Sequence, residues 1–157
     1  MQISLTQKER MLLEDQKSHE ELCIEKYTTY EKQAKDNQLK QICAANGQAE
    51  LLHLNSINQL LSGTVPDLNQ NQNHNQNPMQ NVNNTNTQSG GINLSDKDMC
   101  TDLLMTEKYV SGSYDTTIFE FRDTGARDVL NHIQKEEQKH GEAIFKYMES
   151  KGMYNVK

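Results

Sequence analysis

The stretch that decides the fold is VLNHIQKEEQKHGEAIFKYM, residues 129–148. Its apolar residues, among them Ile133 and Ile144, recur at the three- or four-residue spacing of an amphipathic helix. Two polar residues, Glu137 and His140, interrupt this apolar stripe on the same face. Because residues three apart on a helix project in the same direction, both side chains can reach one bound ion.

The same spacing recurs earlier in the chain as ELLH, where Glu50 and His53 are again three residues apart. Two Glu-x-x-His helices, each with a partner helix that supplies one more Glu, form the di-metal core of ferritin-like bundles. Both pairs fall on apolar stripes, where Glu is rare unless it is paired or bound to metal. The sequence therefore predicts an all-α fold, a four-helix ferritin-like bundle.

Composition limits the function classes. The 157-residue chain is long enough for one domain with a real core, although only 34% of its residues are hydrophobic. A net charge of −6 offers no basic footprint for nucleic acid. No apolar run approaches the roughly 18 residues of a membrane span, and no basic amphipathic face predicts membrane binding. The N-terminal residues lack a signal peptide, so we expect synthesis in the cytoplasm.

The three cysteines show no C-x-x-C pair that would indicate a zinc or redox site. We expect them to be buried free thiols, since free Cys behaves as a small hydrophobe. Intermolecular disulfides are the alternative, and would matter in an insoluble layer. These residues are Cys23, Cys43 and Cys100.

The apolar stripes divide the chain into two helical hairpins that together form one domain. The first hairpin, residues 6–62, opens with a capping box at Thr6 and turns at Asp36. The second hairpin, residues 95–154, opens with Ser95 as its cap. Each hairpin therefore supplies two antiparallel helices to the bundle.

Residues 63–94 separate the hairpins and are rich in Asn and Gln. This segment lacks the apolar surface that would offset its ordering entropy, so we expect a long flexible, disordered linker. Roughly 30 residues of such chain span ~40 Å, enough to join parallel second and third helices.

Counting back through each hairpin turn identifies two further ligand candidates. Glu50 is level with about residue 22, close to Glu20, and Glu137 is level with Glu107. The predicted metal ligands are Glu20, Glu50, His53, Glu107, Glu137 and His140. Carboxylate and imidazole ligands favour two Fe or Mn ions.

Glu25 competes with Glu20 for the ligand position in the first helix. When residues 20–27 are laid over residues 102–109, the two segments share Leu, Glu, Lys and Tyr, and Glu25 falls on Glu107. The distance of Glu25 from the hairpin turn argues against it. Both candidates stay open at this point.

A metal-free bundle is the alternative to the metal site. In that case the inward Glu and His residues pair with one another and with Tyr27, Tyr30 or Tyr114 in a buried hydrogen-bond network. A shift of one residue in the predicted stripes would also move a ligand candidate to solvent.

Residues 95–154 resemble the coat F family of bacterial spore coat proteins, which is itself ferritin-like. The family usually has Trp where this chain has Met153. The resemblance implies a structural component of the spore coat, with other spore coat proteins as partners. It is carried by LSDKDMCTDLL at 94–104, Lys108, Tyr114, Arg127, Glu136–Glu137, FKYM at 145–148 and KGMY at 151–154.

Two functions follow from these observations. The family resemblance implies a structural coat protein. Because the long linker permits exchange of hairpins between two chains, a homo-oligomer is the alternative to a single-chain bundle. The ligand geometry favours the alternative, a di-iron or di-manganese oxidoreductase. That enzyme would be similar to rubrerythrins and manganese catalases, which act on peroxide.

Overall fold

Four long helices make up the computed structural model, which describes residues 1–69 and 94–157. They are α1 (Gln7–Gln33), α2 (Asn37–Leu61), α3 (Asp96–Glu120) and α4 (Thr124–Ser150). The predicted all-α four-helix architecture is thus confirmed. None of the helices in the described part of the chain has the length and apolarity needed to cross a membrane.

Each helix begins at a polar cap. The Thr6 hydroxyl accepts a hydrogen bond from the Glu9 backbone N–H at 3.1 Å, and the Glu9 carboxylate accepts one from the Thr6 N–H at 2.7 Å. This is the predicted capping box, which satisfies two of the backbone donors that a helix start leaves free. The other three N-caps are Asp36, Ser95 and Asp123.

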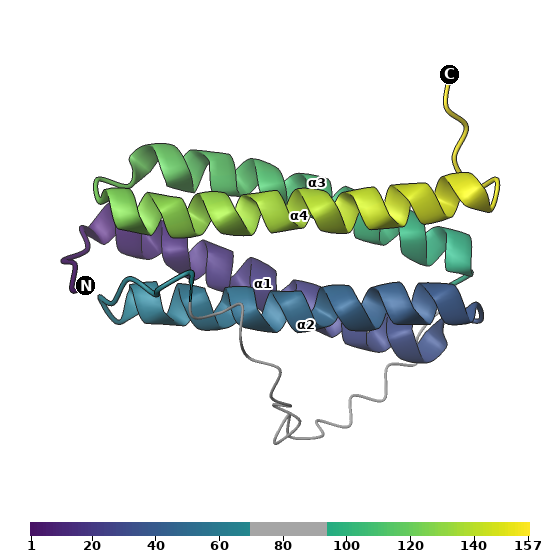
Figure 1. The fold of residues 1–157 in the computed structure, drawn as a ribbon, viewed down its shortest axis with the longest axis horizontal. Helices are drawn as coiled ribbons and strands as arrows, with labels where there is room; N and C mark the ends of the chain where they lie inside the picture. Colours follow the sequence, from purple (N-terminus) through teal and green to yellow (C-terminus); the bar gives the residue numbers. More distant parts are fainter. Residues whose placement is uncertain (70–93) are drawn as a thin grey trace.

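The helices pack as two antiparallel hairpins, α1 with α2 and α3 with α4 (Figure 1). Across the layers α1 contacts α3 and α2 contacts α4. The ribbon runs in the same direction along α2 and α3 (Figure 1), as the long connection between them predicts.

Two apolar clusters form the core. One contains Leu13, Ile57 and Leu130, and the other contains Leu39 and Ile144. On α2, α3 and α4 the residues between the two clusters include buried Glu or His side chains, and on α1 Glu20 is buried next to the boundary between the clusters. The bundle is therefore apolar towards both ends and polar at its middle.

The linker predicted for residues 63–94 begins too early in the sequence. Residues 63–68 belong to the folded unit, because the Ile3 N–H donates to the Gly63 carbonyl and Thr64 bridges to Gln2. Val65 packs against the apolar core beside them. Residues 70–93, where disorder was predicted, lie outside the described residues.

Candidate metal centre

All four helices contribute polar side chains to the middle of the bundle. The six predicted ligands lie together there, and none of them is more than 5% exposed. Helix α1 supplies Glu20, α2 supplies Glu50 and His53, α3 supplies Glu107, and α4 supplies Glu137 and His140.

These side chains form two overlapping groups of four. Within each group the donor atoms lie within 4.8 Å of one another. Glu50 and Glu137 belong to both groups, which is the position of a bridging carboxylate in a two-metal site. Glu20 and His53 complete the first group, and Glu107 and His140 complete the second.

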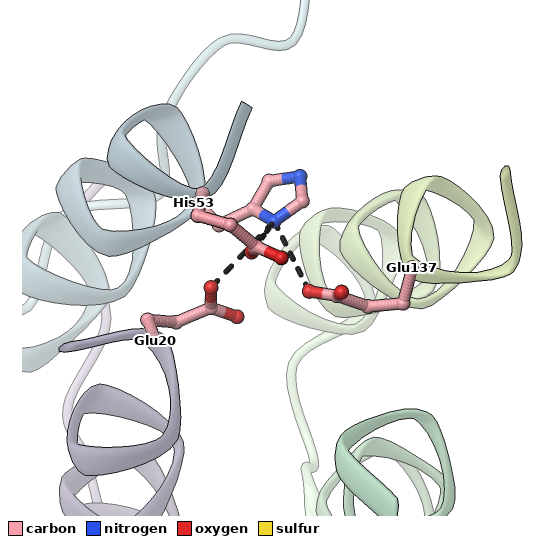
Figure 2. A group of neighbouring side chains, drawn as sticks. Glu20, His53 and Glu137 are labelled. Atoms are coloured by element: carbon pink, nitrogen blue, oxygen red, sulfur yellow. Dashed lines mark hydrogen bonds and ion pairs between the residues drawn. The ribbon is translucent and has the colours of Figure 1, made fainter. Parts of the chain in front are cut away.

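Each histidine directs its Nδ1 atom towards the carboxylates. The Nδ1 atom of His53 lies 3.0 Å from Glu50, 3.2 Å from Glu137 and 3.7 Å from Glu20. Figure 2 shows this convergence of Glu20 and Glu137 on the His53 ring. The corresponding atom of His140 lies 3.1 Å from Glu50 and 3.5 Å from both Glu107 and Glu137.

The structure places Glu20 in the buried cluster and Glu25 outside it. Glu20 is fully buried in the cluster, whereas Glu25 is exposed to solvent. The alignment that matched Glu25 to Glu107 is wrong, because it equates Tyr27, which is 1% exposed, with Tyr109, which is 68% exposed. The residues that match in this alignment therefore lie on different faces of their helices.

The correct internal repeat has an offset of 87 residues. This offset relates the two hairpins at the N-cap of the second helix of each, at a buried Tyr and at every candidate ligand. The pairs are Glu20 and Glu107, Tyr27 and Tyr114, Asp36 and Asp123, Glu50 and Glu137, and His53 and His140. The candidate site thus lies on an approximate two-fold axis between equivalent hairpins.

Two buried tyrosines join the hairpins across this axis. The Tyr27 hydroxyl of α1 donates to Glu107 of α3, and the Tyr114 hydroxyl of α3 donates to Glu20 of α1 at 2.5 Å. Tyr30 instead donates to Asp102, outside the cluster. Two of the three tyrosines considered for a buried network therefore contact the candidate ligands.

The ends of the hairpins are joined by a second repeated contact. The Asp96 carboxylate of α3 accepts the backbone N–H groups of Lys35 and Asp36 at 2.9 and 3.0 Å. Its equivalent, Glu9 of α1, accepts the Arg122 backbone N–H at 3.0 Å. These contacts between hairpins were not predicted from the sequence, where their only signal is the 87-residue offset between Glu9 and Asp96.

Burial and mutual contact set the charges of the cluster. Burial raises the pKa of Glu20 well above its usual value and raises the pKa of Glu107 to about 10. Burial also opposes ionisation of Glu50 and Glu137, but hydrogen bonds from the histidines help to lower the pKa of both carboxyls. Burial alone would lower the pKa of both imidazoles, but their hydrogen bonds with the surrounding Glu side chains have the larger effect. The pKa of His140 is therefore raised to about 11, and that of His53 is raised well above its usual value.

Within the described residues, three buried side-chain oxygens lack any hydrogen-bond partner, and all three belong to the cluster. They are the Oε2 atoms of Glu20, Glu107 and Glu137. Buried polar atoms without partners are costly in a folded protein. The donor set of four carboxylates and two imidazoles therefore fits a pair of cations, because cations would satisfy these free oxygens.

The predicted burial of the thiols is confirmed. Cys23, Cys43 and Cys100 are all free and buried. Neither group of four candidate ligands contains a cysteine.

Fold and site define a class of protein, a helical bundle of two equivalent hairpins around a buried carboxylate–histidine cluster. Residues 95–157, which contain the second hairpin, match the family model of the Coat F domain. The second hairpin is therefore similar to the Coat F domain, which supports a link between this chain and the coat F family of spore coat proteins. Neither the curated proteins nor the solved structures gave a match to this chain.

Proposed function

We propose that this chain is a structural component of the spore coat whose ferritin-like bundle holds a pair of iron or manganese ions. The Coat F domain supports the place in the coat and, with it, other coat proteins as partners. The observation that carries the metal site is the double group of buried donors that shares Glu50 and Glu137.

The chemistry of the donors favours iron or manganese over zinc. Four carboxylates and two imidazoles are ligands that these metals accept readily, whereas thiolate-rich sites favour zinc. Glu50 and Glu137 would bridge the two ions. Glu20 with His53, and Glu107 with His140, would each complete one side.

The charges of the cluster are compatible with this occupancy. Without metal, two protonated histidines face the ionised Glu50 and Glu137, while Glu20 and Glu107 are neutral. That arrangement has no net charge. Two divalent cations with four carboxylates and two neutral imidazoles also sum to zero, so metal adds no uncompensated charge to the core.

Metal analysis of the purified protein tests this proposal. After expression in medium supplemented with iron and manganese, we expect two metal ions per chain, and loss of stoichiometric binding in Glu137→Gln. Glu149→Gln, an exposed substitution on the same helix, is the control and should bind metal normally. Absence of metal from the folded wild-type protein would favour the metal-free hydrogen-bond network instead.

Spores test the structural role separately from the metal. In spores from which the gene for this protein has been deleted, we expect a Glu50→Gln, Glu137→Gln double variant to restore the coat as well as the wild-type protein does. Failure of a folded double variant to restore the coat would show that the coat role depends on metal.

Redox chemistry is the second candidate function. Each group offers four protein donors, fewer than the about six positions that iron or manganese usually fills, so positions stay open for another ligand. A bound pair of such ions would supply redox chemistry towards peroxide. Consumption of peroxide by the metal-loaded protein would support this function, and metal without turnover would leave the structural role.

A further inference from the structure

A groove between α3 and α4 leads from the surface of the bundle to the candidate metal centre. It has a volume of about 510 Å³, and its lining includes Glu107 and Glu137. Both side chains are candidate ligands, and each has one buried oxygen without a partner. The groove therefore reaches two of the candidate ligand residues, while their free oxygens lie buried beyond its floor.

Small residues keep this groove open. Gly141 and Ser111 line it. A Cβ atom on Gly141 would point at the Leu104 side chain, 3.8 Å away, which is an ordinary van der Waals distance. A larger side chain at position 141 would therefore extend into the space between the two helices.

The first hairpin has bulky residues at the equivalent positions. With the 87-residue offset, Ser111 corresponds to Ile24 and Gly141 corresponds to Leu54. Both of these side chains are half-buried. The six candidate ligands thus follow the approximate two-fold symmetry, whereas the groove residues break it.

The walls of the groove indicate what kind of molecule it accepts. Leu104 and Phe145 make it largely apolar, and Tyr154 packs edge-on against Phe145 with ring centroids 5.0 Å apart. Two exposed residues of opposite charge, Lys108 and Glu142, also line it, so these two charges offset one another. A small neutral or singly negative molecule therefore meets no net charge from this pair of residues.

We infer that this groove admits small neutral or singly negative molecules with an oxygen or nitrogen donor atom to the metal pair, and that Gly141 keeps it open. The inference rests on the proposed metal centre. It goes beyond that centre because it assigns one side of the bundle as the entrance. It also identifies residues that are not ligands as the ones that control access to the metal pair.

Azide binding to the iron-loaded, oxidised protein tests the entrance, with the absorbance of the azide complex as the readout. Gly141→Leu and Ser111→Ile place the residues of the first hairpin in the groove from opposite helices. Each should keep the helical content and metal content of the wild type while azide association slows about tenfold or more. Tyr154→Ala, which removes a wall, should speed association.

Lys135→Leu is the matched control, because it adds an apolar side chain at an exposed position of α4 outside the groove. Its azide association should equal that of the wild type. Normal metal content in both groove-filling variants with azide rates within about twofold of wild type would overturn the inference. Wild-type protein without metal would instead overturn the proposed centre, at the earlier step of metal analysis.

Discussion

Gly47 shows how closely single residues determine the packing of this bundle. A Cβ atom on Gly47 would lie 3.3 Å from the Cβ of Tyr27, the residue whose hydroxyl donates to Glu107. The sequence predicts only that a glycine weakens the middle of α2 by about 1 kcal/mol relative to Ala. The structure shows why glycine occupies this position, because α1 approaches α2 closely there.

Two glycine substitutions test this account. A Cβ atom on Gly112 in α3 would meet no neighbouring atom within 4 Å, so Gly112→Ala should stabilise the protein by up to ~1 kcal/mol through helix propensity. Gly47→Ala should lose this gain, because the new methyl group must push Tyr27 aside. Urea denaturation measures both changes, and an equal gain at the two positions would contradict the close contact.

Glu9 makes the free energy of unfolding depend on pH in the acidic range. Burial opposes its ionisation, but hydrogen bonds from the Thr6 and Arg122 backbones and the Arg122 guanidinium lower its pKa to about 2. A lowered pKa means that the ionised form is favoured in the folded state. This contribution is therefore complete above the unfolded value of 4.5 and disappears as the pH falls through about 2.

Glu9→Gln should reduce the free energy of unfolding at pH 7 by up to about 3 kcal/mol, the value of that pKa shift. The difference from wild type should shrink as the pH falls from about 4.5 towards 2. Chemical denaturation at several pH values measures it. Glu14→Gln, at an exposed position of the same helix, should show neither effect, and a difference independent of pH would argue against the ionised Glu9.

At the scale of elements, each hairpin turn is held by a helix of the other hairpin. Asp96 in the first turn of α3 accepts two backbone N–H groups of the α1–α2 turn. Asp98 lies in the same turn of α3 but is exposed. Both carboxylates interact favourably with the start of the helix, so the pair separates this dipole effect from the contact between hairpins.

Asp96→Ala should therefore cost about 1 kcal/mol more than Asp98→Ala, because it also leaves the N–H groups of Lys35 and Asp36 without their partner. It should also speed proteolysis within the α1–α2 turn. Thermal unfolding and limited proteolysis of the two variants provide the comparison. Equal effects of the two substitutions would show that the contact across hairpins adds nothing to stability.

The elements themselves were predictable because their signals are local. Caps such as Thr6 and Ser95 and the glycine at position 63 mark helix ends in the sequence. The candidate ligands were predictable because they interrupt apolar stripes at matching distances from the turns. Local spacing could not decide between Glu20 and Glu25, because only the packing of α1 determines which face is buried.

Contacts between distant segments were not predictable in the same way. Residues 63–68 have the composition of a loop, yet they pair with the N-terminal residues and cover the end of the core. The groove depends on Gly141 lying opposite Leu104 across two helices. Such pairings arise from the relative rotation of packed helices, which apolar periodicity alone leaves open.

The whole molecule is built from two hairpins, each of which holds half of the candidate centre. The Coat F match covers only the second hairpin, and this hairpin contributes Glu107, Glu137 and His140. Alone, it would expose the apolar face that packs on α1 and α2. The hydrogen bonds across the axis would also lose their partners, Tyr27 and Glu20.

We expect a fragment of residues 95–157 to be poorly folded alone and to form a one-to-one complex with a fragment of residues 1–69. The reason is that burial of the shared core must offset the ordering entropy of both hairpins. Circular dichroism of the separate and mixed fragments, with sedimentation analysis of mass, measures this. Two metal ions bound only by the mixture would also place three ligands on each hairpin. A stable symmetric dimer of the 95–157 fragment, formed in preference to the complex with the first hairpin, would contradict the prediction. It would show that two copies of the second hairpin can form the bundle without the complementary side chains of α1 and α2.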